Sequence, residues 1–234
     1  MEVSSIEPIA VSVEPQIVEV YRFDSSHISV FDQIYRQFIK RSIDIFGALV
    51  LLLVLSPVFL IVTLLILRDS PGSVIFRQTR MGRNQTPFAC YKFRSMVAEA
   101  EAILQRDHQL RLIHSTNWKL SNDPRVTRLG RLLRKTSIDE LPQLINVLKG
   151  DMSLIGPRPY MPIELGNEFA RHCATITSVR PGMTGLWQVS GRALLSPHQR
   201  VELDTEYAPN CSLALDFRIA VKTVAVVVRG VGAS

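Results

Sequence analysis

Cysteine is scarce in this sequence, and no two cysteines lie close together. The chain of 234 residues has three, Cys90, Cys173 and Cys211, and none forms a C-x-x-C pair. This spacing indicates neither a zinc site nor a disulfide framework, and a reducing, intracellular location is the simpler interpretation. Motifs for common cofactors are missing too. His172 and His198 lack metal-ligand spacing, and no glycine-rich loop matches the Walker or dinucleotide-binding pattern.

Acidic residues are outnumbered by basic ones. Asp and Glu total 21 against 27 Lys and Arg, which gives a net charge of +6 and a pI of about 9.5. A basic balance favours nucleic acid, anionic lipid or a phosphorylated substrate as partner, without choosing among them. The length suits one domain with a sizeable core, or one domain plus an anchor. Hydrophobic residues make up 47% and mean hydropathy is +0.15, which is apolar for a soluble protein.

One long uncharged segment, residues 45–67, carries much of this apolar content. Its sequence, IFGALVLLLVLSPVFLIVTLLIL, exceeds the roughly 20 apolar residues that a bilayer span needs. The segment is too long and starts too late for a signal peptide. Ser56 and Pro57 lie at its midpoint, where the proline removes a backbone donor and predicts a kink in the helix.

Both flanks of this apolar segment are basic. Lysine and arginine favour the cytoplasmic side of a membrane. A spanning helix would leave one basic flank outside, whereas a helix that enters, turns at Ser56-Pro57 and returns keeps both inside. The residues alone leave both topologies open. The flanking residues are Arg36, Lys40, Arg41, Arg68, Arg77, Arg80 and Arg83.

Beyond the anchor, two short segments are typical of a β-hairpin. Residues 74–76 and 88–93 are strand-like, and the sequence GRNQ between them is turn-like. Residues 97–112 suit a polar helix. Residues 1–38, which are acidic and β-branched at first and interrupted by prolines, predict a variable, partly disordered lead-in.

Arginine recurs at every third position from Arg125 to Arg134 and is followed by Lys135. On a helix this spacing makes a basic stripe that drifts slowly around one face. A solvated surface, a contact with lipid head groups and a phosphate-binding face all fit such a stripe.

Two adjacent carboxylates, Asp139 and Glu140, follow the stripe in the segment TSIDELPQLINVLKGD. Ser137 and Glu140 match the capping box S-x-x-E. The acids are therefore expected at a helix N-terminus, where free N–H groups and the helix dipole suit phosphate. Ordinary helix capping is the better explanation of this motif alone. An apolar helical face is predicted at Leu141, Leu144, Ile145 and Leu148.

Two later segments, GDMSLIGPRPYMP and VRPGMTGLWQVSGR, hold arginines among prolines and glycines. Arg158 lies between two prolines, and Arg180 precedes Pro181-Gly182. A rigid backbone holds planar guanidinium groups that suit phosphate oxygens, although turns alone also explain the prolines and glycines. Residues 212–234 are apolar with interspersed charges, which fits either an amphipathic interfacial helix or a buried terminal helix.

Together these segments resemble the bacterial sugar transferases, the small monotopic phosphoglycosyl transferases that prime polysaccharide synthesis. The resemblance runs from about Lys40 to Thr223 and looks closest to the initiating enzymes of exopolysaccharide assembly that use UDP-galactose or UDP-glucose. One departure is Cys211 in NCSLALD, because relatives commonly have Trp before that serine. The resemblance rests on KRSIDIFGALVLLLVLSP, FRQTRMGRNQTPFACYKFRSM, DPRVTRLGRLLRKTSIDELPQLINVLKGDMSLIGPRP and RPGMTGLWQVSGR.

The resemblance implies a two-step reaction that moves a sugar 1-phosphate from a UDP-sugar to undecaprenyl phosphate and releases UMP. Asp139 would be the nucleophile and would form a phosphosugar-aspartate, and Glu140, with Asp139, would hold Mg²⁺. The membrane helix would be re-entrant, with its break at Ser56-Pro57. Phosphate-binding positions carried over from the family are Lys92, Arg134, Arg158 and Arg180.

The expected fold is mixed α/β and mostly helical. It is a monotopic membrane protein with a re-entrant N-terminal membrane helix, amphipathic interfacial helices and a small β-hairpin. Residues 1–38 are the variable segment, 39–68 the membrane helix and 69–234 the cytoplasmic catalytic domain. The expected location is the cytoplasmic face of the bacterial inner membrane.

The expected role is the first membrane step of exopolysaccharide biosynthesis. Membrane lipid and downstream glycosyltransferases are expected partners, nucleic acid is not, and the resemblance allows a homodimer. Larger relatives carry extra N-terminal membrane helices, which we expect this chain to lack. The alternatives are a membrane-anchored nucleic-acid-binding protein and a non-catalytic scaffold.

Overall fold

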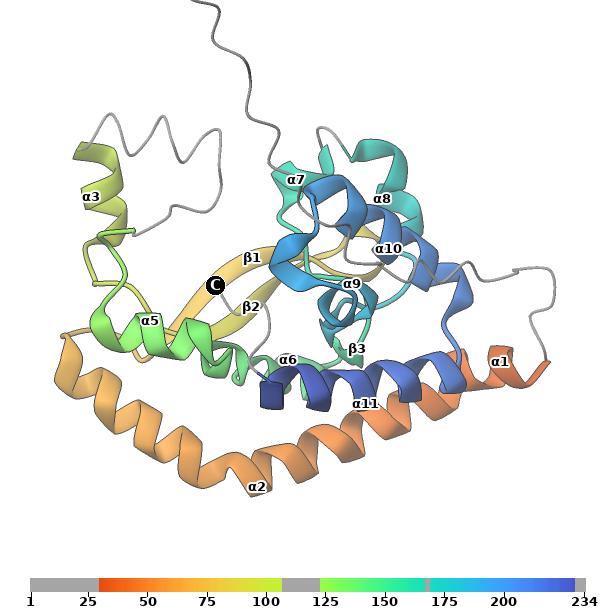
Figure 1. The fold of residues 1–234 in the computed structure, drawn as a ribbon, viewed down its shortest axis with the longest axis horizontal. Coiled ribbons are helices and arrows are strands. Elements are labelled where there is room, and N and C mark those ends of the chain that lie inside the picture. The colour runs from red at the N-terminus through yellow and green to blue at the C-terminus, as the bar shows by residue number, and fades with distance from the viewer. Residues whose placement is uncertain (1–29, 107–122, 167–168, 230–234) are drawn as a thin grey trace, which may run out of the picture.

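We analysed a computed structural model of the chain, which describes residues 30–106, 123–166 and 169–229 (Figure 1). The described fold is mostly helical with two small sheets. Most of the predicted variable segment 1–38 lies outside the described residues, as does the end of the predicted helix 97–112. The helices are α1 (Val30–Ile34), α2 (Lys40–Asp69), α3 (Ala100–Arg106), α5 (Arg128–Lys135), α6 (Gln143–Lys149), α7 (Pro162–Gly166), α8 (Ala170–Ile176), α9 (Leu186–Val189), α10 (Pro197–Asn210) and α11 (Leu213–Arg229). The strands are β1 (Ile75–Met81), β2 (Pro87–Phe93), β3 (Ser153–Ile155) and β4 (Gly182–Thr184).

The apolar segment forms α2, which is long and apolar enough to cross a membrane. Of the 18 consecutive residues of α2 with the highest hydropathy, only 11% are buried within the protein. Pro57 lies inside the helix, and the Ser56 hydroxyl donates to the Leu53 carbonyl at 2.8 Å. Figure 1 shows α2 bending about midway without interruption. The bend follows from the backbone hydrogen bond that proline cannot make.

Both arms of α2 pack against the rest of the protein. On the first arm, Ala48 joins a buried cluster with Leu144 and Met152. On the second arm, Val62 and Ile66 pack with Phe93 and Leu133. Because the two arms contact the same body, both ends of the helix rise to the same side in Figure 1.

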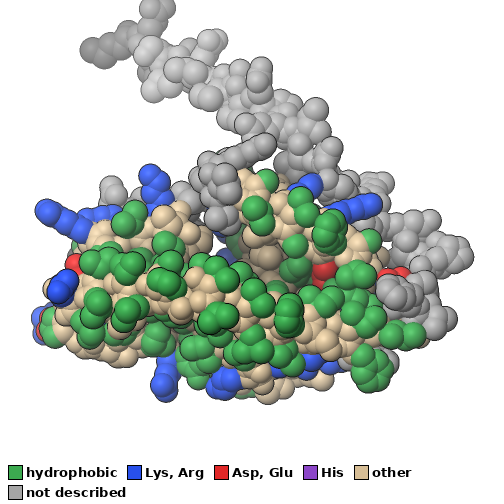
Figure 2. All heavy atoms as spheres, turned by 90° about the horizontal axis from the view of Figure 1, so that it is seen from below, with side chains coloured by type: hydrophobic (Ala, Val, Ile, Leu, Met, Phe, Trp, Pro, Cys, Tyr) green, Lys and Arg blue, Asp and Glu red, His purple; other side chains and the backbone are tan. Residues whose placement is uncertain are grey.

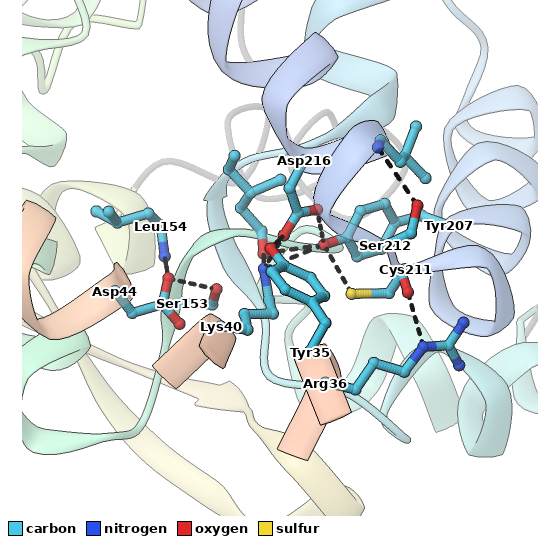
Figure 3. A network of polar contacts seen from close by, with 12 residues as sticks. Tyr35, Arg36, Lys40, Asp44, Ser153, Leu154, Tyr207, Cys211, Ser212 and Asp216 are labelled. Atoms are coloured by element: carbon cyan, nitrogen blue, oxygen red, sulfur yellow. Dashed lines mark hydrogen bonds and ion pairs between the residues drawn. The ribbon is translucent and has the colours of Figure 1, made fainter. Parts of the chain in front are cut away.

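A buried polar network fixes the start of α2 (Figure 3). Lys40 forms an ion pair with Asp216 of α11 and donates to the Ile155 carbonyl at 2.9 Å. The hydroxyls of Tyr35 and Tyr207 donate to the two oxygens of Asp216 at 2.5 and 2.6 Å. The first arm is thereby attached to α11 and β3.

The end of α2 is fixed by one arginine. The Arg94 guanidinium donates to the carbonyls of Ile66, Ser70 and Pro71, at 3.3, 2.5 and 2.8 Å. Ile66 lies in the last turn of α2 and Ser70 and Pro71 follow its end, a place where backbone carbonyls favour a cation.

The predicted β-hairpin is confirmed. Strands β1 and β2 pair antiparallel, with a register from Ile75–Phe93 to Met81–Pro87. The loop between them closes with a hydrogen bond from Gly82 N to Thr86 O at 2.8 Å. Side chains along β2 point alternately to the two faces of the hairpin, and Cys90 lies on the buried face. The hairpin therefore packs against the hydrophobic cluster that contains Leu144 and Met152.

The predicted arginine stripe does not form one helical face. Helix α5 begins only at Arg128, because Thr127 accepts a hydrogen bond from Gly130 N at 2.9 Å and caps the helix there. Arg125 therefore precedes the helix, where it is buried and forms an ion pair with Asp123 at 2.8 Å.

The predicted capping box at Ser137 is wrong. Ser137 has a left-handed φ of 58° and makes no capping hydrogen bond, and Ile138–Glu140 forms a 3-10 turn. Helix α6 starts after Pro142. In a helix that began at Ile138, the ring of Pro142 would clash with the Ile138 carbonyl, four residues earlier. The predicted apolar face also differs, since Ile145 is 41% exposed while Val147 is buried.

The C-terminal helix α11 has one buried and one exposed face. Leu215 and Ile219 are buried, whereas Phe217, Val221 and Val224 are exposed. Figure 2 shows hydrophobic side chains spread over the face that α2 and α11 form, with Lys and Arg along its edge. The amphipathic character predicted for residues 212–234 is thus present in α11.

Cys211 stands where the family resemblance leads us to expect Trp. Its side chain is 1% exposed and belongs to the cluster that holds Tyr35, Tyr207 and Leu215. The smaller residue is thus fully packed at the junction of α10 and α11.

Candidate active site

The two adjacent acids lie in the 3-10 turn Ile138–Glu140, between α5 and α6. Asp139 is buried, with 8% of its surface exposed, whereas the Glu140 side chain keeps 40% exposure. Ile138 and Leu141 on either side pack against the cluster around Phe93 and Leu133. The hydrophobic neighbours therefore hold the turn in place and bury one acid more deeply than the other.

Strand β2 brings a lysine to this turn. Lys92 Nζ lies 2.6 Å from Glu140 Oε1 and forms an ion pair with it. Burial would raise the pKa of Glu140, but the Lys92 ammonium, with weaker help from Arg158 and Arg80, outweighs burial and lowers this pKa below its ordinary value. Glu140 is therefore a carboxylate at neutral pH.

Asp139 responds in the opposite direction. Burial, together with the neighbouring charge of Glu140, raises the pKa of Asp139 from 3.8 to about 6, although Lys92 and Arg134 oppose the rise. A carboxylate that has lost most of its water and has a pKa near neutrality is typical of a reactive group. The chain thus holds two adjacent acids in different electrostatic states.

Two arginines approach the acids from other elements. Arg134, at the end of α5, donates to Ser95 Oγ at 2.9 Å, and its charge acts on Asp139. Arg158, in the loop after β3, lies 3.6 Å from Glu164, and its charge acts on Glu140. The predicted residues Lys92, Arg134 and Arg158 are thus gathered around the acid pair.

The chain also matches a known protein family. The family model described as "Bacterial sugar transferase" matches residues 35–230. The chain belongs to the bacterial sugar transferase family. All the site residues named above fall inside the matched range.

Several named bacterial proteins are similar in sequence to this chain. A UDP-galactose-lipid carrier transferase of Erwinia amylovora is 44% identical over 201 residues, which are 84% of this chain and 42% of the relative. An undecaprenyl-phosphate galactose phosphotransferase of Salmonella typhimurium is 44% identical over 204 residues, again 84% of this chain and 42% of the relative. The exopolysaccharide production protein ExoY of Rhizobium meliloti is 43% identical over 189 residues, 79% of this chain and 83% of the relative. The chain therefore spans less than half the length of the first two relatives and most of the third.

Arg180 is the predicted site residue of this sugar transferase that lies apart from the acid pair. Its Nε donates to the Gly150 carbonyl at 2.8 Å, just beyond the C-terminal end of α6, and its nearest charged neighbours include Arg41 and Arg83. The acids lie before the other end of α6. Within the described residues no contact links Arg180 to either acid, and its phosphate-binding role stays a prediction.

Three side chains near the site were not predicted from the sequence. The Ser95 hydroxyl accepts a hydrogen bond from the Arg134 guanidinium. Arg80, which counted only as a basic flank of the membrane segment, is buried and donates to the Pro159 carbonyl at 3.1 Å. Asp204 of α10 binds the Arg158 loop. These contacts join residues far apart in the chain, and no local spacing could have indicated them.

Asp139 and Glu140 are the two carboxylates that could hold the predicted Mg²⁺. Within the described ranges, no cluster of three or more acids, histidines or cysteines is placed to hold a metal ion. Asp139 and Glu140 could therefore supply two ligands at most. Mg²⁺ commonly takes one or two carboxylates and completes its shell with substrate phosphate and water, so the donor set fits this ion.

Proposed function

We propose that this chain transfers a sugar 1-phosphate from a UDP-sugar, UDP-glucose or UDP-galactose, to undecaprenyl phosphate and releases UMP. The observation that carries the proposal is Asp139, a buried carboxylate with a pKa near 6 beside an ionised Glu140, with three cationic side chains around the pair. The names of the relatives, among them an undecaprenyl-phosphate galactose phosphotransferase and ExoY, support this substrate class and a role in exopolysaccharide initiation.

The reaction proceeds in two displacements. In the first, an Asp139 oxygen attacks the phosphorus that carries the sugar, and the bond from this phosphorus to the bridging oxygen breaks, so that UMP leaves. In the second, a phosphate oxygen of undecaprenyl phosphate attacks the same phosphorus and the bond to Asp139 breaks. The carboxylate is restored, and covalent catalysis of this kind divides one difficult step into two.

The surrounding charges make the encounter of several anions feasible. Lys92 holds Glu140, and Arg134 and Arg158 face the phosphates of the donor, where guanidinium groups bind oxygens in pairs. Glu140, with Asp139, would hold Mg²⁺, which supplies further neutralisation of the phosphate charge when bound. Positioning and neutralisation provide most of the catalysis in phosphoryl transfer.

The membrane arrangement follows from the same proposal. One substrate is water-soluble and the other lies in a lipid leaflet, so the site must lie at their boundary. Both arms of α2 pack against one body, which supports a re-entrant helix with its turn at Ser56-Pro57 rather than a span. The exposed apolar face of α11 supports its placement in the interface, on the cytoplasmic face of the inner membrane.

Labelling of the protein by its donor tests the reaction. Incubation with a UDP-sugar that carries a labelled sugar, without lipid acceptor, should label the native protein and release UMP. Asp139→Asn should abolish both, and Glu140→Gln should weaken the Mg²⁺ dependence first. A panel of UDP-sugars identifies the donor. Normal labelling and turnover of Asp139→Asn would show that the nucleophile is another residue.

The nucleic-acid alternative rests on the net charge and the arginine stripe, and the structure bears on two residues of that stripe. Arg125 is paired with Asp123, and Arg134 is bound to Ser95, so these two members of the stripe are not presented together on a surface. The scaffold alternative predicts no UMP release with any UDP-sugar. A homodimer and contacts with downstream glycosyltransferases stay predictions.

A further inference from the structure

Asp204 of α10 is a buried acid that lies far along the chain from Asp139 and Glu140. Its relative exposure is 0%. Its Oδ2 accepts hydrogen bonds from the Arg158 backbone N–H at 3.0 Å and from the Tyr160 hydroxyl at 2.8 Å. Its Oδ1 has no hydrogen-bond partner within the described part of the chain. A carboxylate buried with half of its acceptor capacity unused is costly, so a role beyond stability is expected.

The loop that Asp204 binds has a single backbone N–H at its centre, that of Arg158. Pro157 and Pro159 have no N–H, and the N–H of Arg158 between them goes to Asp204. The flanking carbonyls are also fixed, because Pro157 O accepts from Gly182 N at 2.8 Å and Pro159 O accepts from Arg80 at 3.1 Å. Asp204 is therefore the charged anchor of a loop whose conformation the prolines already restrict.

The side chain of Arg158 depends on the same anchor. Its guanidinium carbon lies 5.9 Å from the centre of the Tyr160 ring and 6.0 Å from that of Trp187. Tyr160 is held through its hydroxyl by Asp204. One carboxylate thus fixes both the backbone of Arg158 and one of the aromatic rings against which the guanidinium lies.

We propose that Asp204 is a positioning residue that holds the Arg158 guanidinium in place against Tyr160 and Trp187, through the Arg158 N–H and the Tyr160 hydroxyl. The inference rests on the proposed function, in which Arg158 binds a substrate phosphate. Asp204 is fully buried and touches no reacting atom, so it acts only through Arg158.

The charge of Asp204 adds a pH dependence. Burial raises the pKa of Asp204 from 3.8 to about 7, although the Arg158 N–H, the Tyr160 hydroxyl and the Arg158 charge oppose this rise. Those groups face Asp204 from the loop after β3. On the other packed elements, His172 of α8 contacts the neighbouring Thr205, and Arg200 of α10 lies over Trp187 of α9. Hydrogen bonds to an ionised acceptor are stronger, so the loop is held more firmly above pH 7.

A double-mutant cycle tests the inference. Asp204→Asn keeps the size and one acceptor oxygen but removes the charge. At pH 8 we expect it to lower kcat/KM for UMP release by about 3- to 10-fold in the protein with native Arg158, and by less than about 2-fold in the Arg158→Ala background. The ratio of native to Asp204→Asn activity should also shrink toward pH 6, where native Asp204 is largely protonated. Equal losses in both backgrounds would mean that Asp204 only stabilises the fold, and the inference would be overturned.

Hydrogen exchange gives a readout that needs no substrate. Asp204→Leu removes both acceptor contacts, so the amide of Arg158 should exchange faster while the β1–β2 hairpin keeps its native rates. Unchanged exchange at Arg158 in the folded variant would also overturn the inference. If Asp204→Leu does not fold, Asp204→Asn provides both measurements. Failure of the proposed function would be a separate result, in which the native protein releases no UMP with any UDP-sugar. The hydrogen-exchange measurement would still test whether Asp204 holds the Arg158 loop.

Discussion

At the scale of single residues, Asp139 and Glu140 show how two identical chemical groups acquire different properties. The acids are adjacent in one turn, yet the pKa of Asp139 is raised to about 6 by burial and that of Glu140 is lowered by Lys92. The difference arises because burial and the charge of Glu140 dominate at Asp139, while β2 brings the Lys92 ammonium to Glu140. A proton donor or nucleophile needs such separation of roles.

Neutralising the two acids should change stability in opposite directions. The folded-state pKa of Asp139 lies above its ordinary value, so the stability that its protonated form contributes is present below about pH 4 and is lost as the pH rises through 6. At pH 8, ionised Asp139 costs the folded state on the order of 1–3 kcal/mol. Asp139→Asn should therefore abolish activity and raise the thermal midpoint at pH 8.

Glu140→Gln provides the matched control for that experiment. The folded-state pKa of native Glu140 is lowered, so its ionised form stabilises the folded protein above the ordinary pKa of a glutamate. This stabilisation is lost as the pH falls through the folded-state pKa. The glutamine variant should melt below the native protein at pH 8. Thermal melts in detergent at pH 4 and pH 8 check both variants. A lower midpoint for Asp139→Asn at pH 8 would contradict the electrostatic account.

The pH profile of activity should follow the ionisation of Asp139. Only the carboxylate form is a nucleophile, so kcat/KM for UMP release should rise with pH through about 6 and level off above it. Lys92 opposes the rise of this pKa, and its removal should raise the pKa further. Lys92→Met should therefore shift the acidic limb of the profile to higher pH as well as lower the plateau. Lys149→Met, which removes an exposed lysine that lies over Tyr91, should leave the limb in place.

At the scale of elements, local patterns predicted the sheet and the anchor better than the helix ends. The hairpin was predictable because strand-like residues flank a turn sequence, and the apolar segment because no charge interrupts it. The capping box failed because Pro142 forces the helix to begin later, and the arginine stripe failed because Thr127 caps α5 three residues inside it. Ser95 and Asp204 were not predictable, since their contacts depend on how α5 and α10 pack against distant loops.

The packing of α5 against Ser95 gives a prediction at this scale. Gly130 faces the Ser95 backbone so closely that a β-carbon there would collide with its carbonyl. Glycine to alanine within an exposed helix stabilises by about 1 kcal/mol, but here overpacking should reverse the sign and destabilise by about 1–3 kcal/mol. Gly130→Ala should also lower activity, because α5 carries Arg134 away from Asp139. Chemical denaturation and UMP release measure both effects, with the exposed Lys135→Ala expected to change stability by less than about 0.5 kcal/mol. A stabilised Gly130→Ala variant would show that α5 and Ser95 are not in this contact.

At the scale of the whole molecule, α2 packs against both helices that flank the candidate active site, through two buried clusters. Leu133 packs with Val62 and Ile66 of α2 and lies in α5, the helix that carries Arg134. Leu144 of α6 packs with Ala48 on the other arm. The turn that holds Asp139 and Glu140 connects α5 to α6, so the anchor supports the acid pair from both sides. If α2 lies in a membrane as proposed, its depth there and the position of the acids are linked mechanically.

The packing of both arms of α2 against the rest of the protein predicts the membrane topology. If α2 enters and leaves the same leaflet, exposed positions before and after it lie on the cytoplasmic side. Gln33→Cys and Ser73→Cys, each in a Cys173→Ser background, should resist a membrane-impermeant thiol reagent in intact cells and react in inverted membrane vesicles. The native Cys90 and Cys211 are buried and should stay silent in the folded protein. Reaction of Gln33→Cys from outside intact cells, with Ser73→Cys reacting only from inside, would mean that α2 spans the bilayer. Such a span would require one arm of α2 to leave the core, because the body that both arms contact cannot lie on two sides of a membrane at once.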